Sequence, residues 1–310
     1  MTTHVATPPS TRPVAVTRPP QSNWTRDHVQ RRVFGVLRWV VIAIFLIATL
    51  VPFYYMLLLS VKPIEALLRD PASLTVSPSE FTLQTYVQVL SSTANGGQGF
   101  AGFILNSAIV AVCSVILALA LGIPGAYAIA RLPFVGHRQV SGVFLAAYLF
   151  PGILMAIPLF VGFTRVGLRG SLLGLILVYT AQTVPVAIYM LRNYFETVPV
   201  SIEEAGLVDG LTRIGVLRQI SLRLAMPSIM STGLFVFMIA WNEFLFALLF
   251  LVDRRERWTV SLGLSQLSGS VEVPTTVLMA GSVVLTLPII ILFFATERLL
   301  TGGLTAGAEK

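Results

Sequence analysis

The residues best suited to act on another molecule gather in one stretch of the sequence, residues 204–223. It opens with Glu204-Ala205-Gly206 and has Asp209-Gly210 near its middle. The polar segment around it covers about 35 residues between two apolar runs, whereas most helix–helix connections need far fewer. Two interpretations are open. The stretch is either a solvated connector or a docking element whose carboxylates pair with arginines of a partner protein.

The local pattern predicts two short helices that meet at a glycine. Ser201 is expected to cap the first helix, because Glu204 follows three residues later, as in a capping box. Gly210 is expected to end that helix, since glycine adopts the left-handed conformation at little cost. A second helix follows over 211–226, so that the pair forms a compact amphipathic knob with Gly210 as its hinge. The acids expected to face a partner are Glu203, Glu204 and Asp209, while simple helix capping is the alternative role for Glu204.

Catalytic and metal-binding chemistry find no support in the sequence. The single cysteine, Cys113, lies inside an apolar run and is expected to be a core residue. The three histidines are scattered, so no metal-ligand cluster is expected. No GxxxxGKS or GxxxxGKT loop occurs, so the chain cannot bind ATP through a P-loop of its own. We therefore expect no catalytic residue, no metal site and no cofactor bound by this chain.

The composition indicates an integral membrane protein with an all-α fold. Of the 310 residues, 55% are hydrophobic and 11% charged, with a mean hydropathy of +0.82, whereas soluble domains carry about 25% charged residues. Six apolar segments are long enough to cross about 30 Å of hydrocarbon as helices. They lie at about 39–61, within 103–130, between 138 and 165, between 169 and 192, at about 227–251 and at about 275–296.

Charge distribution predicts the orientation of these six spans. With the N-terminus inside, fourteen Lys and Arg residues fall on the inner side and seven on the outer side. The positive-inside rule then favours an N-in, C-in topology in the cell membrane and places the loop at about 193–226 in the cytoplasm. Residues 1–30, rich in Pro, Thr and Ser, are expected to be a retained disordered tail, and residues 31–310 one transmembrane domain. The basic residues flank apolar spans, so no nucleic-acid partner is expected.

The spacing within 204–223 resembles the EAA motif of ABC importer permeases. Glu204-Ala205-Gly206 is followed by three residues, Gly210, nine residues, Ile220, one residue and Leu222. Two positions depart from the motif, because Gly206 stands where a second Ala is usual and Arg223 where a Pro is usual.

Other segments are similar to the smaller permease subunit of maltose-type carbohydrate importers, so that the resemblance covers about residues 34–310. The segments are Asn106-Ser107, Ala126-Tyr127-Ala128-Ile129-Ala130-Arg131, Trp241-Asn242-Glu243-Phe244 and Gly302-Gly303-Leu304-Thr305-Ala306-Gly307.

This resemblance implies the six-helix fold of a type I ABC importer permease and a role in importing a sugar or polyol. It implies a second homologous permease, two ATPase subunits that use ATP and Mg²⁺, and an extracytoplasmic binding protein. The EAA loop would be the coupling helix that fits the ATPase, with contacts from Glu203, Glu204, Ala205, Gly206, Asp209 and Gly210.

Polar residues within or beside the spans are candidates for the translocation pathway. Ionisable groups at membrane depth usually face a cavity or a partner, and a Trp face beside polar groups suits a sugar. The alternative is that these groups are satisfied inside the helix bundle or at the interface with a second permease. The candidates are Asn106, Tyr148, Gln182, Trp241, Asn242 and Glu243.

The outer loop between the last two spans is expected to contact the binding protein, as the resemblance implies. A solvated cap is the alternative. The candidates are Trp258, Ser265, Gln266 and Ser268.

A different class of function remains open at this point: a stand-alone secondary carrier or channel for a small polar solute. Such a carrier is expected to show an internal repeat and paired broken helices. The two halves of the sequence show no convincing repeat.

Overall fold

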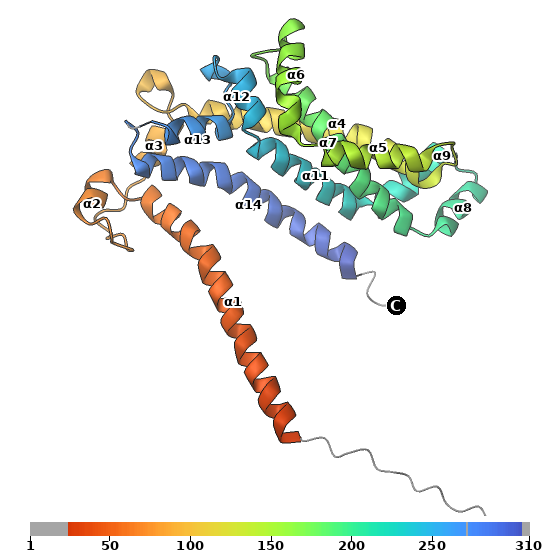
Figure 1. Ribbon diagram of the computed structural model, residues 1–310, viewed down its shortest axis with the longest axis horizontal. Coiled ribbons are helices and arrows are strands. Elements are labelled where there is room, and N and C mark those ends of the chain that lie inside the picture. The colour runs from red at the N-terminus through yellow and green to blue at the C-terminus, as the bar shows by residue number, and fades with distance from the viewer. Residues whose placement is uncertain (1–23, 271, 306–310) are drawn as a thin grey trace, which may run out of the picture. The chain divides into compact units, whose positions relative to one another are not determined.

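The computed structural model describes residues 24–270 and 272–305, and every regular element in this part of the chain is a helix. The prediction of an all-α fold is confirmed (Figure 1). The elements are α1 (Trp24–Ser60), α2 (Ile64–Arg69), α3 (Gln84–Leu90), η1 (Thr93–Asn95), α4 (Phe100–Arg131), α5 (His137–Leu149), α6 (Gly152–Arg165), α7 (Leu172–Thr197), α8 (Val200–Val208), α9 (Arg213–Val216), η2 (Leu217–Ser221), α10 (Leu222–Leu224), α11 (Met226–Asn242), α12 (Leu245–Leu251), η3 (Arg255–Arg257), α13 (Val260–Ser268) and α14 (Thr275–Thr305).

Among the residues that the structure describes, four helices are long and apolar enough to cross a membrane, and the number is six if each of two bent pairs counts as one span. The four lie in α1, α4, α7 and α14. The bent pairs are Gln139–Leu149 with Gly152–Arg165, at 89°, and Arg213–Leu224 with Met226–Asn242, at 76°. The third expected span is therefore a broken one.

A proline accounts for the break between α5 and α6. Pro151 is the N-cap of α6, and Phe150 before it is extended, as sterics next to the proline ring favour. Four other prolines lie inside continuous helices: Pro124 in α4, Pro158 in α6, Pro185 in α7 and Pro288 in α14.

The fifth expected span is interrupted as well. Helix α11 ends at Asn242 and α12 begins at Leu245, with Glu243 in an extended conformation between them. The apolar run there is continuous in sequence, so composition alone does not reveal the interruption.

The long helices α4 and α7 pack tightly along their length through small residues. An added Cβ at Gly122 of α4 would lie 3.2 Å from the Ala187 Cβ of α7, and one at Gly125 would lie 3.2 Å from Ile188. Close backbone approach of this kind is typical of helix pairs in membranes. In the same unit, α7, α11 and α14 run together, with α8 and α9 at one end and α13 at the other (Figure 1).

The chain divides into two compact units, residues 1–54 and 55–310. In the first unit, α1 exposes apolar side chains such as Trp39 and Phe45 along its length, which is typical of a helix that needs lipid or partner helices around it. The expected boundary at residue 30 falls inside α1, which begins at Trp24. Residues 1–23 of the expected tail lie outside the described residues, and the division into a tail and one domain stays a prediction.

Candidate coupling site and translocation pocket

Residues 200–224 form the expected knob, although its first helix begins differently from the prediction. Pro199 is the N-cap of α8 and no side chain caps the helix, so the capping box at Ser201 is wrong. Pro199 has a φ of −59°, which its ring fixes, and α8 begins at Val200, two residues earlier than a helix capped by Ser201 would. Gly210 ends α8 with a φ of +90°, as expected.

The second helix is shorter and less regular than the expected 211–226. The Thr212 side chain caps α9 by accepting a hydrogen bond from the Gly215 N–H at 3.2 Å. The π-helical turn η2 follows, then α10. The chain turns by 76° at Ala225, just before Pro227. Single π turns often occur at functional sites.

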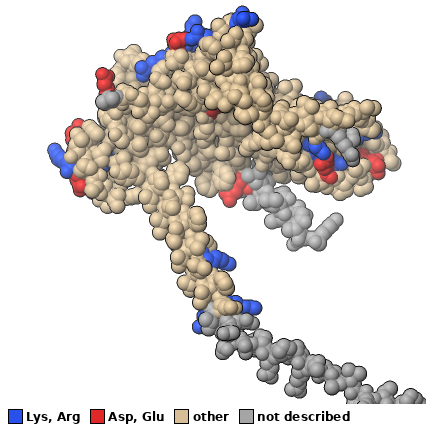
Figure 2. Space-filling model, in the orientation of Figure 1, with Lys and Arg blue, Asp and Glu red and all other residues tan. Residues whose placement is uncertain are grey.

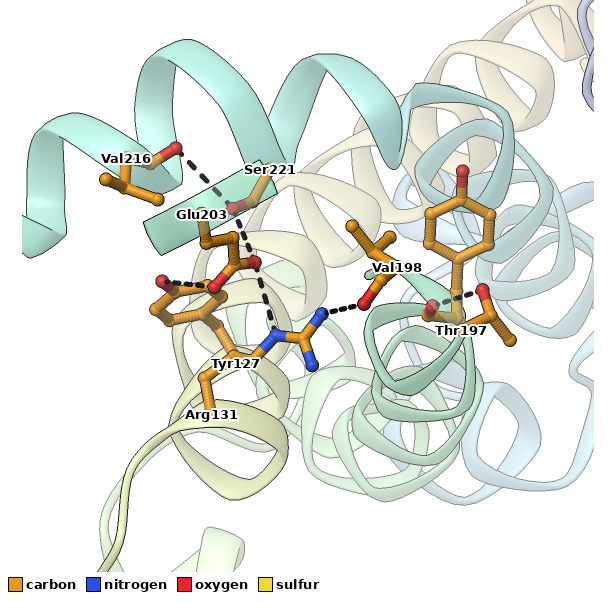
Figure 3. A network of polar contacts seen from close by, with 8 residues as sticks. Tyr127, Arg131, Thr197, Val198, Glu203, Val216 and Ser221 are labelled. Atoms are coloured by element: carbon orange, nitrogen blue, oxygen red, sulfur yellow. Dashed lines mark hydrogen bonds and ion pairs between the residues drawn. The ribbon is translucent and has the colours of Figure 1, made fainter. Parts of the chain in front are cut away.

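The knob is joined to the membrane helices by a network of polar contacts centred on Glu203 (Figure 3). Oε1 of Glu203 accepts from Arg131 Nε at 3.2 Å and from Ser221 Oγ at 3.0 Å, and Oε2 accepts from the Tyr127 hydroxyl at 3.2 Å. Arg131 Nη2 also donates to the Val198 carbonyl at 2.6 Å. The network therefore connects the end of α4, the residue after α7, the first knob helix and η2.

Because it is buried, the ion pair between Arg131 and Glu203 contributes to the stability of the fold. The Arg131 and Glu203 side chains are each 8% exposed. Removing one partner of a buried pair typically costs about 3–5 kcal/mol, because the remaining charge stays uncompensated. Glu203 was expected to share the partner-facing surface with Glu204, but its carboxylate points into the protein instead.

Glu204 and Asp209 are exposed, as a docking role requires. The same surface carries exposed apolar side chains, with Val208 at 87% and Ile214 at 66% exposed. Ala205 and Gly210 are also exposed. The exposed face of the knob therefore combines carboxylates with apolar groups that lack cover in this chain.

Gly206 is buried under Ile220 of η2. A Cβ at this position would lie 2.5 Å from Ile220 Cδ1 and 3.4 Å from Val216 Cγ2. Glycine here lets the second half of the knob pack directly on α8. Arg223, the other departure from the EAA pattern, is exposed within α10, two residues before the turn at Ala225.

Two of the expected pathway residues, Glu243 and Trp241, are engaged inside the bundle. Glu243 accepts hydrogen bonds from the N–H groups of Phe246 and Ala247 at 2.9–3.3 Å and from the Tyr179 hydroxyl at 2.5 Å, so it caps α12. Trp241 is 2% exposed and stacks on Phe237, which leaves neither face of its ring free for a sugar.

Asn242 donates to the Met238 carbonyl of its own helix, although it is otherwise exposed. For Glu243, the geometry matches the alternative interpretation of a satisfied carboxylate.

Asn106 is engaged in a similar way at the start of α4. Its Nδ2 donates to the carbonyls of Glu256 and Trp258, each at 3.0 Å. It therefore holds the connection between α12 and α13 in place.

Tyr148 and Gln182 lie on one pocket. The pocket has a volume of about 330 Å³ and lies at the break between α5 and α6. Its described lining is apolar apart from these two side chains and contains no charged one. The lining residues are Ala147, Tyr148, Phe150, Gly152, Met155, Leu159, Val178, Ala181, Gln182, Pro185 and Ile239.

The expected contacts for a binding protein fall on a helix rather than a loop, because Ser265, Gln266 and Ser268 belong to α13. Gln266 and Ser268 are exposed and Ser265 is half-buried. Trp258 packs against Phe103, with ring centroids 5.7 Å apart, and donates to the Leu251 carbonyl at 3.0 Å. It is thus an anchor of its loop.

Sequence reasoning missed the partners of Glu203. Arg131 had a usable signal, because it is the sole charged residue of α4. Tyr127 stands with Arg131 in the segment 126–131 that carries the resemblance, whereas Ser221 had no signal. Their roles depend on tertiary packing.

Comparisons with known proteins agree with this geometry. Residues 118–302 match the family described as binding-protein-dependent transport system inner membrane component. The chain is 38% identical over 270 residues to the inner membrane ABC transporter permease protein YcjP of Escherichia coli (strain K12), covering 87% of this chain and 94% of that one. It is 33% identical to the trehalose/maltose transport system permease protein MalG of Thermococcus litoralis, covering 92% and 99%.

A solved structure shows the same fold. The crystal structure of a bacterial ABC transporter involved in import of the acidic polysaccharide alginate aligns with a TM-score of 0.73 and 22% identity, over 91% of this chain and 99% of that one. These matches show that the alternative of a stand-alone carrier or channel is wrong. The chain belongs to the binding-protein-dependent transport system inner membrane component family and is a multi-pass permease subunit of an ABC importer.

Proposed function

We propose that this permease forms half of a translocation pathway for a sugar or related polyol and that its knob contacts a separate ATPase. A second, homologous permease forms the other half. Two ATPase subunits bind ATP and Mg²⁺, while this chain holds no cofactor of its own. An extracytoplasmic binding protein delivers the substrate, and the knob and both termini lie on the cytoplasmic side, as the charge distribution favours.

The observation that carries the coupling proposal is the contrast between two adjacent carboxylates. Glu203 is buried in an ion pair with Arg131 of a membrane helix, whereas Glu204 is exposed on the outer face of the knob. A force that the ATPase applies to the knob at Glu204 therefore reaches α4 through the buried ion pair. A solvated connector would need neither the buried attachment nor an exposed apolar face.

The names of the relatives and the pocket support a neutral sugar or polyol as substrate. The MalG relative is named for trehalose and maltose, and a SugB relative from Mycobacterium tuberculosis, 33% identical, for trehalose. In the pocket, the Tyr148 hydroxyl and the Gln182 amide offer hydrogen bonds beside the apolar surface of Phe150 and Met155. A few polar groups on an apolar lining suit a polyhydroxylated, uncharged ligand.

The test of the coupling proposal is the Glu204→Arg substitution in the assembled transporter. We expect the variant to lose ATPase subunits on purification, or to retain them with substrate uptake at least about tenfold below wild type, because reversal at an interface charge pair costs a few kcal/mol. The readouts are co-purification, uptake into proteoliposomes and ATP hydrolysis. The substrate is identified by a thermal-shift screen of neutral and acidic sugars on the binding protein.

Glu65→Arg is the matched control, because Glu65 is an exposed carboxylate on α2, remote in sequence from the knob. It should leave assembly and uptake unchanged. Wild-type uptake and hydrolysis in the Glu204→Arg variant would refute the coupling role, and reproducible purification of wild type without any ATPase would refute the proposed function as a whole.

A further inference from the structure

We propose that a hollow on the knob's side of the membrane binds the headgroup of a phospholipid that carries both a phosphate and an amine. The hollow has a volume of about 970 Å³ and lies between the end of α4, the connection from α4 to α5 and the last two turns of α7. Figure 2 shows basic and acidic side chains gathered at the end of the molecule where Figure 1 places α5, α8 and α9. The proposal requires that the chain spans a membrane, and it does not depend on the substrate or on the ATPase.

The hollow lies where two membrane helices reach their first charged residue. Helix α4 is uncharged from Phe100 to Ala130 and ends at Arg131, and α7 is uncharged from Leu172 until Arg192. Uncharged runs of this length cross the apolar core of a membrane, so the arginine that follows each run lies near the lipid headgroups. The two helices therefore bring their arginines to the same membrane surface.

Arg131 lines the hollow and has one donor without a partner among the described residues. Its Nε donates to Glu203 and its Nη2 to the Val198 carbonyl, so Nη1 is the unpaired end of the guanidinium (Figure 3). The side chain is only 8% exposed, and polar groups in such surroundings are normally hydrogen-bonded. A guanidinium binds phosphate oxygens well. A phosphate in the hollow would therefore complete the hydrogen bonds of Arg131.

Arg192 and Glu196 of α7 add a second cation and an acceptor to the lining. Arg192 lies 2.9 Å from Glu196 Oε1 through Nε and 2.8 Å through Nη2, and its Nη1 donates to the Ser141 hydroxyl of α5. The Arg192 guanidinium is thus held in place before any ligand arrives, which lowers the entropy lost on binding. Both contacts with Glu196 end on Oε1, so Oε2 has no partner among the described residues.

The charges around the hollow match a zwitterionic headgroup. The described charged side chains there are Arg131, Arg192, Glu196 and Glu203, whose charges sum to zero. A phosphate on the arginines, together with an ammonium on Glu196 Oε2, keeps this balance. A bare phosphate would leave a net negative charge at the edge of the membrane, where an uncompensated charge is costly.

The apolar part of the lining favours a lipid over a free anion or a polar protein segment. Leu132, Phe134 and Val135 of the connection line the hollow and are exposed, Val135 fully. Helix α5, which follows, exposes Val143 and Leu149, so apolar surface continues from the hollow along this helix. Acyl chains cover such surface at the headgroup boundary and remove it from water. One lipid molecule therefore satisfies both the charged and the apolar sides of the hollow.

The test adds phosphatidylethanolamine in steps to the complete transporter in detergent and counts bound lipid by native mass spectrometry. In Arg192→Gln we expect affinity for this lipid to fall at least about tenfold, because a charge-assisted hydrogen bond to the phosphate is lost. Glu196→Gln should abolish the preference for phosphatidylethanolamine over phosphatidylcholine, whose methylated amine cannot donate. The control Arg223→Gln changes an exposed arginine at the same end but outside the hollow and should bind like wild type.

Equal affinities of wild type and Arg192→Gln would overturn the proposal, as would a wild type that binds the two lipids equally well. If Arg192→Gln does not assemble, Val135→Ser in the exposed connection replaces it, with an expected loss of about threefold. Inorganic phosphate that binds as tightly as the lipid would assign the hollow to a free anion instead. A photoreactive phosphatidylethanolamine should label residues 129–135 in the complete transporter, and label confined to other segments would show that a protein partner fills the hollow.

Discussion

At the residue scale, adjacent side chains in this permease have separate tasks because a helix turns about 100° per residue. Glu203 faces Arg131 and Tyr127 inside the protein, and Glu204 faces outward. The same separation holds at the end of α11, where Trp241 is buried and Asn242 is exposed. The role of a carboxylate at membrane depth therefore follows from its hydrogen-bond and ion-pair partners and not from its position in the sequence.

Glu243 provides a test of this point. Its carboxylate caps α12 and accepts from Tyr179, so we expect Glu243→Gln to keep uptake within about twofold, since the amide oxygen still accepts at the cap. Glu243→Ala should lower the free energy of unfolding by about 1–2 kcal/mol, as loss of a helix cap does. Thermal unfolding and the KM for uptake measure the two effects. A large rise in KM for Glu243→Gln at unchanged stability would instead show that the carboxylate contacts the substrate.

At the element scale, apolar composition predicted where the long helices lie, but not where they break. The spans in α4, α7 and α14 follow from apolar length, which depends on local composition alone. The interruption at Glu243 comes with capping of Phe246 and Ala247 by its carboxylate, and the 76° turn at Ala225 comes just before Pro227, so neither break shows in apolar composition. The knob shows both cases: Gly210 was predicted from its backbone freedom, whereas the attachment through Arg131 joins residues 72 apart in sequence.

The packing of the knob on itself gives a prediction at this scale. Gly206→Ala places a Cβ against Ile220 Cδ1, so we expect a loss of about 1 kcal/mol in stability from overpacking. Ile220→Val removes that Cδ1 atom and should relieve the effect when combined with Gly206→Ala. Thermal unfolding of the three variants in detergent measures the coupling between the two sites. Additive effects of the two substitutions would contradict direct contact between Gly206 and Ile220.

At the scale of the whole molecule, α4 and α7 connect the knob to the pocket within the permease unit, residues 55–305. The knob lies at the ends of α4 and α7, and the pocket with Tyr148 and Gln182 lies at the break between α5 and α6. Motion at the knob can reach the pathway because the buried Arg131–Glu203 pair joins the knob to α4, which packs along α7. The central claim is that this pair transmits force.

The measurement that tests this claim most directly is the amount of substrate imported per ATP hydrolysed when the pair is reversed. Arg131→Glu and Glu203→Arg each leave a buried like-charge pair, so we expect either variant to import much less substrate per ATP than wild type. The double variant Arg131→Glu/Glu203→Arg restores opposite charges and should recover much of the ratio.

The matched control is reversal of the partly exposed pair Arg192–Glu196 on α7, at 2.8 Å, which should leave the ratio unchanged because such pairs contribute little. The predicted result is that both single variants import less substrate per ATP than wild type, whereas the double variant Arg131→Glu/Glu203→Arg recovers much of the ratio. Single variants that fold, assemble and keep the wild-type ratio would contradict the account.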